Sequence, residues 1–134
     1  MITVYLADKQ VLFREGIHFT LSGEEDIEVV GETTDNEEAL NFLETTPPNV
    51  AILSMSYCQP SSTEVTRRVK QTLPTSVSII LVADSDNEEH FFAAMKCGAN
   101  ACVTKDIDLD TLLQTIREVA KGDKPIMKAL SARR

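Results

Sequence analysis

The chain of 134 residues carries a formal net charge of −8, and 43% of its residues are hydrophobic. This length suits one domain that buries a core of its own. The acidic charge argues against a surface for nucleic acid or for an anionic membrane, because phosphate groups are bound by basic side chains. No apolar run approaches the ~20 residues of a membrane span, so we expect a soluble domain without membrane contact.

Cysteine usage indicates a reducing environment. The three cysteines, Cys58, Cys97 and Cys102, are odd in number and have no Cys-x-x-Cys spacing. The N-terminal residues are strand-like and no basic segment precedes them, so they are unlike a signal peptide. These features favour thiols over a disulfide framework, and we expect a cytoplasmic protein.

Five short runs of β-branched and aliphatic residues recur along the chain at even intervals. Each run is almost continuously apolar, which is typical of a strand buried on both faces of a sheet. The predicted strands, in chain order, are Ile2–Ala7, Ile27–Gly31, Val50–Leu53, Val77–Ala83 and Ala101–Val103.

The segments that follow these runs have the periodicity of amphipathic helices. In chain order, the predicted apolar faces are Leu12, Phe13, Ile17 and Leu21; Ala39, Leu40 and Leu43; Val65, Val69 and Leu73; Phe91, Phe92 and Met95; and Leu109, Leu112, Leu113, Ile116 and Ala120. Strands that alternate with helices form a parallel sheet with helices on both faces. The predicted fold is therefore a doubly wound (βα)5 α/β domain over residues 1–123, with residues 124–134 as the start of a linker or a C-terminal tail.

Capping residues mark the predicted helix ends. Asp35, Ser61 and Asp86 each precede a glutamate by three residues, which is the spacing of a capping box. Gly98 and Gly122 follow the fourth and fifth helices, where a left-handed residue commonly ends a helix. These positions predict three helix starts and two helix ends.

Five segments of this sequence resemble those of a known family: Ala7–Gly16, Val29–Glu32, Glu64–Arg68, Cys97–Ala101 and Thr104–Asp106. Over its whole length the chain resembles the receiver domains of two-component response regulators, most closely those of NarL/FixJ-type transcription factors. The resemblance implies a flavodoxin-like fold with a five-stranded parallel sheet in the order 2-1-3-4-5. It also implies a role in signal transduction and no enzymatic activity.

The chain departs from the family at the positions that its phosphoryl chemistry needs. Receivers bind a divalent metal through acidic side chains and accept a phosphoryl group on an aspartate. The resemblance places the phosphoacceptor at Ser54 and one of the metal-binding acids at Ala7, whereas Asp8 and the phosphoryl-binding Lys105 match. We therefore expect no cofactor and weak or absent Mg²⁺ binding, with Asp8 as the one weak candidate ligand.

The positions that relay phosphorylation in the family are altered as well. Ala83 stands at the Ser/Thr switch position and Cys102 at the aromatic switch position, so there is no hydroxyl to pull and no ring to move. Cys97 and Cys102 are interpreted as small core residues. Cys58, which replaces a family proline on a loop, is the better candidate for a reactive thiol.

Two interpretations stay open for the remnants of the acid pocket. Ser54 is interpreted as a small residue that fills the altered pocket, and the alternatives are phosphorylation by a dedicated kinase or contact with a small ligand. Asp8 and Lys105 are interpreted as a buried ion pair that joins two strand ends, and the alternative is a weak metal or anion site.

The sequence thus predicts an atypical receiver that signals through protein contacts without aspartyl phosphate, as the regulatory part of a transcription factor. The expected partners are a sensor kinase or another regulator, and a second copy in a homodimer. DNA contact is expected only through a helix-turn-helix domain that these residues do not contain. Two interpretations stay open for the chain itself: a stand-alone receiver, or a fragment that ends inside a linker at Ser131–Arg134. The alternative function is a switch controlled by Ser54 phosphorylation or by a small ligand. An enzyme is disfavoured, since the sequence has no nucleotide-binding glycine motif or nucleophile elbow.

Overall fold

The computed structural model describes residues 1–56 and 58–132, which form five strands and six helices. The strands are β1 (Ile2–Ala7), β2 (Ile27–Thr33), β3 (Val50–Ser54), β4 (Ser78–Ala83) and β5 (Ala101–Thr104). The helices are α1 (Val11–Ser22), α2 (Asn36–Thr45), α3 (Ser62–Thr72), α4 (Glu88–Lys96), α5 (Leu109–Ala120) and α6 (Pro125–Ala132). All five predicted strands are present, and their bounds differ from the prediction by at most two residues.

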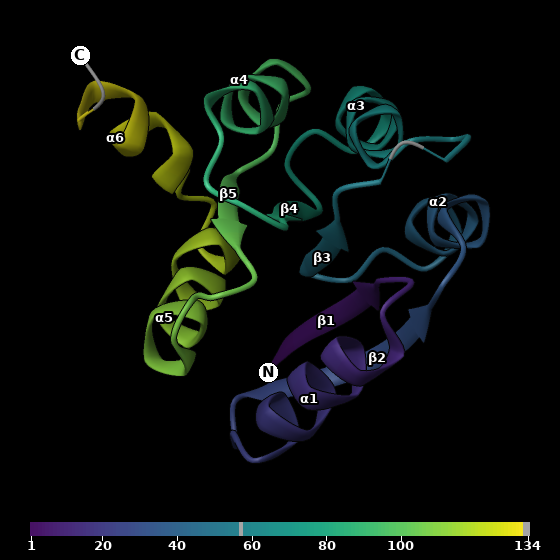
Figure 1. Cartoon of the computed structure of the whole chain (residues 1–134). Coiled ribbons are helices and arrows are strands. Elements are labelled where there is room, and N and C mark those ends of the chain that lie inside the picture. Colours follow the sequence, from purple (N-terminus) through teal and green to yellow (C-terminus); the bar gives the residue numbers. More distant parts are fainter. Residues whose placement is uncertain (57, 133–134) are drawn as a thin grey trace.

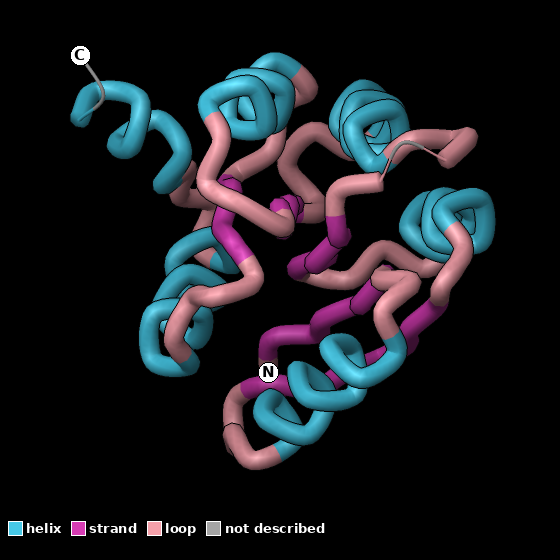
Figure 2. The backbone as a smooth tube through the Cα atoms, viewed as in Figure 1, coloured by secondary structure: helices cyan, strands magenta, loops and turns pink. Residues whose placement is uncertain are grey.

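The strands form one parallel sheet in the order β2-β1-β3-β4-β5, as the resemblance implies. Helices α1 and α5 cover one face of the sheet, and α2, α3 and α4 cover the other (Figure 1). Figure 2 shows the strands between these two helical layers. Within the described residues, no helix combines the length and the apolar character that crossing a membrane requires.

The two faces of the sheet bury separate apolar clusters because successive strand side chains point to opposite sides. In β4, Ile79 and Leu81 pack toward α2, α3 and α4, whereas Ile80 and Val82 pack toward α1 and α5. All six residues of β4 are buried. This two-sided burial explains why the central strands have continuous apolar sequences instead of alternating ones.

Capping confirms two of the three predicted helix starts. The side chains of Asp35 and Ser61 accept hydrogen bonds from backbone N–H groups in the first turns of α2 and α3. The assignment of Asp86 as the cap of the fourth helix is wrong, because Asn87 Oδ1 accepts the hydrogen bond from Glu89 N at 2.7 Å and α4 begins at Glu88. Asn and Asp cap equally well, so sequence spacing could not decide between these neighbours.

Both predicted helix-ending glycines have the left-handed conformation. Gly98 has φ 94° and follows α4, and Gly122 has φ 92° and follows α5. Only glycine adopts this conformation without steric cost, so both positions turn the chain out of its helix.

Three large apolar residues placed on predicted buried faces are exposed instead. Leu12 on α1 is 85% exposed, and Phe92 and Leu109 also reach solvent. On α1 the buried side is formed by Phe13, Ile17 and Leu21, which pack toward the sheet. Leu12 directly precedes Phe13, so it lies about 100° around the helix axis from this stripe and points outward.

Helix α6 is an element that the sequence analysis did not predict. Its Ile126 is buried in the cluster beneath α2, α3 and α4, and the Ile126 N–H donates to Asn100 O at 3.1 Å. Asn100 Nδ2 in turn donates to Asp123 O at 3.3 Å. Residues 125–132 are therefore helical and attached to the domain, whereas a linker or tail had been predicted there; the domain boundary at residue 123 stays a prediction.

Gly31 in β2 illustrates how tightly the sheet packs. The rings of Tyr5 and Phe42 stack with centroids 4.3 Å apart, and a Cβ atom at position 31 would lie 2.9 Å from Tyr5 Cε1. Burial raises the pKa of Tyr5 to about 12, in keeping with a ring held in the core. The glycine thus leaves the space that this aromatic pair occupies.

We predict that Gly31→Ala lowers the free energy of unfolding by about 1–3 kcal/mol, because the added methyl group overpacks the Tyr5 ring. Gly16→Ala is the matched control, since a Cβ atom there meets nothing within 4 Å. The control replaces a glycine inside α1 and is expected to raise stability by about 0.5–1 kcal/mol. Urea unfolding measures both, and equal stability of the two variants would contradict the packing described.

Candidate functional site

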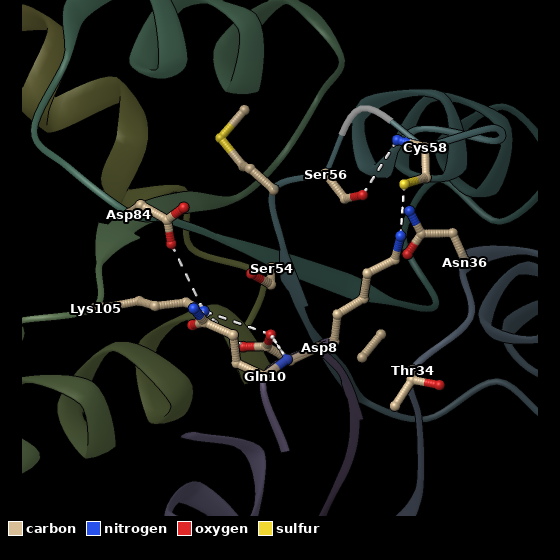
Figure 3. A pocket seen from close by; sticks show the side chains of 12 residues that line it. Asp8, Gln10, Thr34, Asn36, Ser54, Ser56, Cys58, Asp84 and Lys105 are labelled. Carbon is tan, nitrogen blue, oxygen red and sulfur yellow. Dashed lines mark hydrogen bonds and ion pairs between the residues drawn. The ribbon is translucent and has the colours of Figure 1, made fainter. Parts of the chain in front are cut away.

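A polar pocket of about 210 Å³ opens at the carboxyl ends of the strands (Figure 3). Parallel strands end on the same edge of the sheet, so residues that follow β1, β3, β4 and β5 meet there. The side chains that line the pocket include those of Asp8, Lys9, Gln10, Ser54, Cys58, Asp84 and Lys105. The structure therefore brings the predicted site residues Asp8, Ser54 and Lys105 into one pocket.

Asp8 is buried at the end of β1 and is held by two kinds of contact. Its Oδ1 accepts a hydrogen bond from Gln10 N at 2.8 Å, and its Oδ2 lies 3.1 Å from Lys105 Nζ. Within the described residues Oδ2 accepts no hydrogen bond, so the lysine ammonium is the group that compensates its charge. A buried carboxylate without a counter-charge is costly, so we expect this ion pair to stabilise the pocket.

The Lys105 ammonium also contacts Gln10 and the ring of Phe13. It donates a hydrogen bond to Gln10 Oε1, and Nζ lies 4.7 Å from the centre of the Phe13 ring. Its side chain is 15% exposed, which leaves part of it open to the pocket. The aromatic face and the amide oxygen both favour a cation at this position.

Asp84 is a second carboxylate in the pocket that the sequence analysis left without a role. Its Oδ1 lies 3.7 Å from Lys105 Nζ, on the loop after β4, and its side chain is 76% exposed. The signal was present in the sequence, because an acid that directly follows a parallel strand points to this edge. In residues 1–56 and 58–132, no three His, Cys, Asp or Glu side chains come together as metal ligands would.

A network behind the pocket fixes the backbone at Asp8. Arg14 Nη1 donates to Asp8 O at 2.8 Å, and Arg14 Nε donates to Glu32 Oε1 at 2.8 Å. His18 Nδ1 contacts the other Glu32 oxygen. The Arg14 guanidinium and His18 hold the pKa of Glu32 below its ordinary value. The sequence analysis included Arg14 and Glu32 only in motif segments and missed this contact.

The remaining predicted positions, Ser54, Ala83 and Cys102, lie in β3, β4 and β5. Ser54 is half-buried at the end of β3 and lines the pocket. Ala83 is buried at the end of β4, and Cys102 in β5 is half-buried and packs toward α2, α3 and α4. Neither switch-equivalent residue lines the pocket.

Cys58 lies at the pocket rim beside Lys9. Lys9 Nζ donates a hydrogen bond to Cys58 Sγ at 2.5 Å, and Cys58 N donates to Ser56 Oγ at 3.3 Å. The Lys9 contact, followed by that of Ser56, lowers the pKa of the Cys58 thiol. Burial raises the pKa of the Cys97 thiol instead. The exposed Cys58 thiol and the partly buried Cys97 thiol thus have pKa values shifted in opposite directions.

Residues 4–117 match the family described as response regulator receiver domain. The chain belongs to this family. It is 30% identical over 121 residues to the transcriptional regulatory protein DegU of Brevibacillus brevis. The match covers 90% of this chain and 51% of that protein. It is 26% identical over 129 residues to the nitrate/nitrite response regulator NarL of Escherichia coli K12. This match covers 96% of this chain and 59% of that protein.

Solved structures agree with this assignment. The receiver domain of the response regulator NarL from Mycobacterium tuberculosis has a TM-score of 0.83 at 26% identity and covers 90% of this chain and 97% of that chain. The isolated receiver domain of RcsB from Salmonella enterica has a TM-score of 0.80 at 25% identity, and the match covers 92% of this chain and 91% of that chain. The chain spans 51% and 59% of the length of these two curated relatives, whose names describe regulatory proteins.

We predict that Asp8→Ala lowers the free energy of unfolding by about 2 kcal/mol, because it leaves the partly buried Lys105 ammonium without its nearest counter-charge. Asp84→Ala is the matched control from the same pocket, since its exposed carboxylate is expected to contribute less than about 0.5 kcal/mol. Urea unfolding at neutral pH measures both changes. Unaltered stability of Asp8→Ala would show that the ion pair does not hold the strand ends together.

Proposed function

We propose that this receiver signals through protein contacts without an aspartyl phosphate, as the regulatory part of a transcription factor. The observation that carries the proposal is Ser54, which ends β3 and lines the pocket where the family places its phosphoacceptor aspartate. A serine hydroxyl cannot form an acyl phosphate, and it is a weak nucleophile without a neighbouring base. Neither His18, which contacts Glu32, nor His90 in α4 lines the pocket.

The donor set of the pocket does not fit the divalent metal that receivers use. Mg²⁺ requires near-octahedral oxygen coordination with carboxylate ligands. Asp8 already faces the Lys105 ammonium at 3.1 Å, and Asp84 lies on an exposed loop with the same ammonium 3.7 Å away. A metal ion would have to displace this lysine, so the proposed function includes no metal-dependent step.

Loss of the acceptor is matched by loss of the family's relay. In a conventional receiver the phosphoryl group attracts a Ser/Thr hydroxyl and an aromatic ring follows. Here the corresponding side chains are a buried methyl group at Ala83 and a thiol at Cys102. Both ends of the relay are altered together, which favours a domain with a phosphate-independent role over one defective residue in an ordinary switch.

Exposed apolar side chains support a role in protein contact. Leu12 and Phe19 on α1 are 85% and 84% exposed, and Leu109 at the start of α5 is also exposed. Contiguous apolar surface commonly marks contact with a partner, and Leu12 and Phe19, seven residues apart, share one side of α1. Contact with a sensor kinase or another regulator, or with a second copy, is therefore part of the proposal. DNA contact would belong to a separate domain, because the curated relatives continue well beyond the matched length.

We predict that acetyl phosphate with Mg²⁺ adds no hydroxylamine-labile phosphate to this chain, because no acid occupies the acceptor position. Intact-mass spectrometry before and after hydroxylamine measures the modification. A conventional receiver with an aspartate acceptor, treated in parallel, serves as the reagent control and gains one labile phosphate. A labile phosphate on the wild-type chain, at Asp8 or Asp84, would contradict the proposal. A hydroxylamine-resistant phosphate that is lost in Ser54→Ala would instead support control through Ser54.

A further inference from the structure

We propose that peroxide oxidation of Cys58 joins its sulfur to the Lys9 side-chain nitrogen in a covalent sulfenamide bond. This modification site goes beyond the proposed function and does not depend on it. It is carried by the direct contact of a thiol and an amine, which come from two different loops at the rim of the pocket.

The two loops are held opposite each other by the sheet. Lys9 directly follows Asp8 after β1, and Cys58 lies on the loop that connects β3 to α3. β1 and β3 are neighbouring parallel strands, with Ala7 paired to Leu53 at their ends. Lys9 Nζ contacts the sulfur of Cys58, a residue that lines the pocket in Figure 3. The contact therefore bridges 49 positions of sequence on a rigid frame.

The environment makes Cys58 the thiol that reacts first. Sulfur is oxidised as the thiolate, and a cation in contact with it stabilises that form. Lys9 Nζ supplies the cation at 2.5 Å, and both residues are exposed, so a small peroxide reaches the sulfur. Cys97 is partly buried and its pKa is raised, so it is the poorer nucleophile.

The chemistry balances in two steps. The Cys58 thiolate attacks one oxygen of hydrogen peroxide; the S–O bond forms, the O–O bond breaks and hydroxide leaves, so sulfur is oxidised and peroxide is reduced. The Lys9 amine, after giving one proton to solvent, then attacks this sulfur; the S–N bond forms and the S–O bond breaks. The departing hydroxide takes up one of the two hydrogens left on nitrogen and forms water, so the sulfenamide nitrogen keeps one hydrogen. The net change in the chain is the loss of two hydrogen atoms from the neutral side chains.

The bond would change the pocket in two ways. It removes the positive charge of Lys9 from the pocket rim, and it ties the loop after β1 to the loop after β3. Both effects are reversible, because an external thiol reduces the sulfur–nitrogen bond and restores the amine and the thiol. The reversal gives the modification the character of a switch on the same edge of the sheet.

We predict that hydrogen peroxide lowers the intact mass of the chain by two hydrogen atoms and that dithiothreitol restores it. Tryptic mapping is expected to show one crosslinked peptide that contains Cys58 and an uncleaved Lys9. The double variant Cys97→Ser/Cys102→Ser is expected to give the same mass loss, which separates the crosslink from a disulfide. Loss of the effect in this double variant would overturn the proposal.

Lys9→Arg is the decisive variant, since it keeps a positive charge beside the thiol and removes the attacking amine. We expect it to abolish the mass loss and to leave a sulfenic acid that dimedone traps. Lys121→Arg, an exposed lysine after α5, is the matched control and is expected to behave like the wild type. The proposal is overturned if Lys9→Arg still loses two hydrogen atoms, or if the wild-type crosslink retains an oxygen atom between sulfur and nitrogen.

Discussion

The buried carboxylate of Asp8 is the constraint around which the functional edge of this domain is organised. Its position after β1 takes it out of solvent, and the charge must be balanced there. Lys105 provides the counter-charge at 3.1 Å, and Arg14 holds the Asp8 backbone from the opposite side. The pair joins the ends of β1 and β5, which are separated in the sheet by β3 and β4. The Asp8 carboxylate therefore faces an ammonium group of the protein itself.

This internal balance connects the altered residues to the proposed role. In a receiver with three carboxylates, metal and phosphoryl group are needed to neutralise the charge, and their arrival is the signal. We propose that, with Ser54 at the acceptor position and Ala83 at the switch position, the pocket neither needs these groups nor responds to them. In this proposal the domain acts through contact with another protein, and the exposed Leu12 and Phe19 of α1 are candidate contact residues. The reaction proposed for this pocket is instead the oxidation of Cys58 beside Lys9.

The sequence was sufficient for the parts of the fold that depend on local patterns. The apolar run of β4 predicted a strand buried on both faces, and Gly98 predicted the end of α4. It was insufficient where neighbouring residues compete or where tertiary contacts decide. Asn87 caps α4 in place of Asp86, and α6 depends on the core contact of Ile126.

The site shows the same division. Family resemblance placed Asp8, Ser54 and Lys105 on one edge, because parallel strands end together. The role of Asp84 depends on the path of a loop, and the contact of Lys9 with Cys58 depends on two loops at once. Neither contact follows from spacing along the chain.

The central claim is that this pocket does not respond to the aspartyl-phosphate state. The most direct test is an amide NMR spectrum of the chain before and after addition of Mg²⁺ and beryllofluoride, which mimics aspartyl phosphate. We expect unchanged signals near Asp8, Ser54 and Lys105 and in α4. Joint shifts of the pocket residues and α4 would show that the domain is still a conventional switch and would contradict the account.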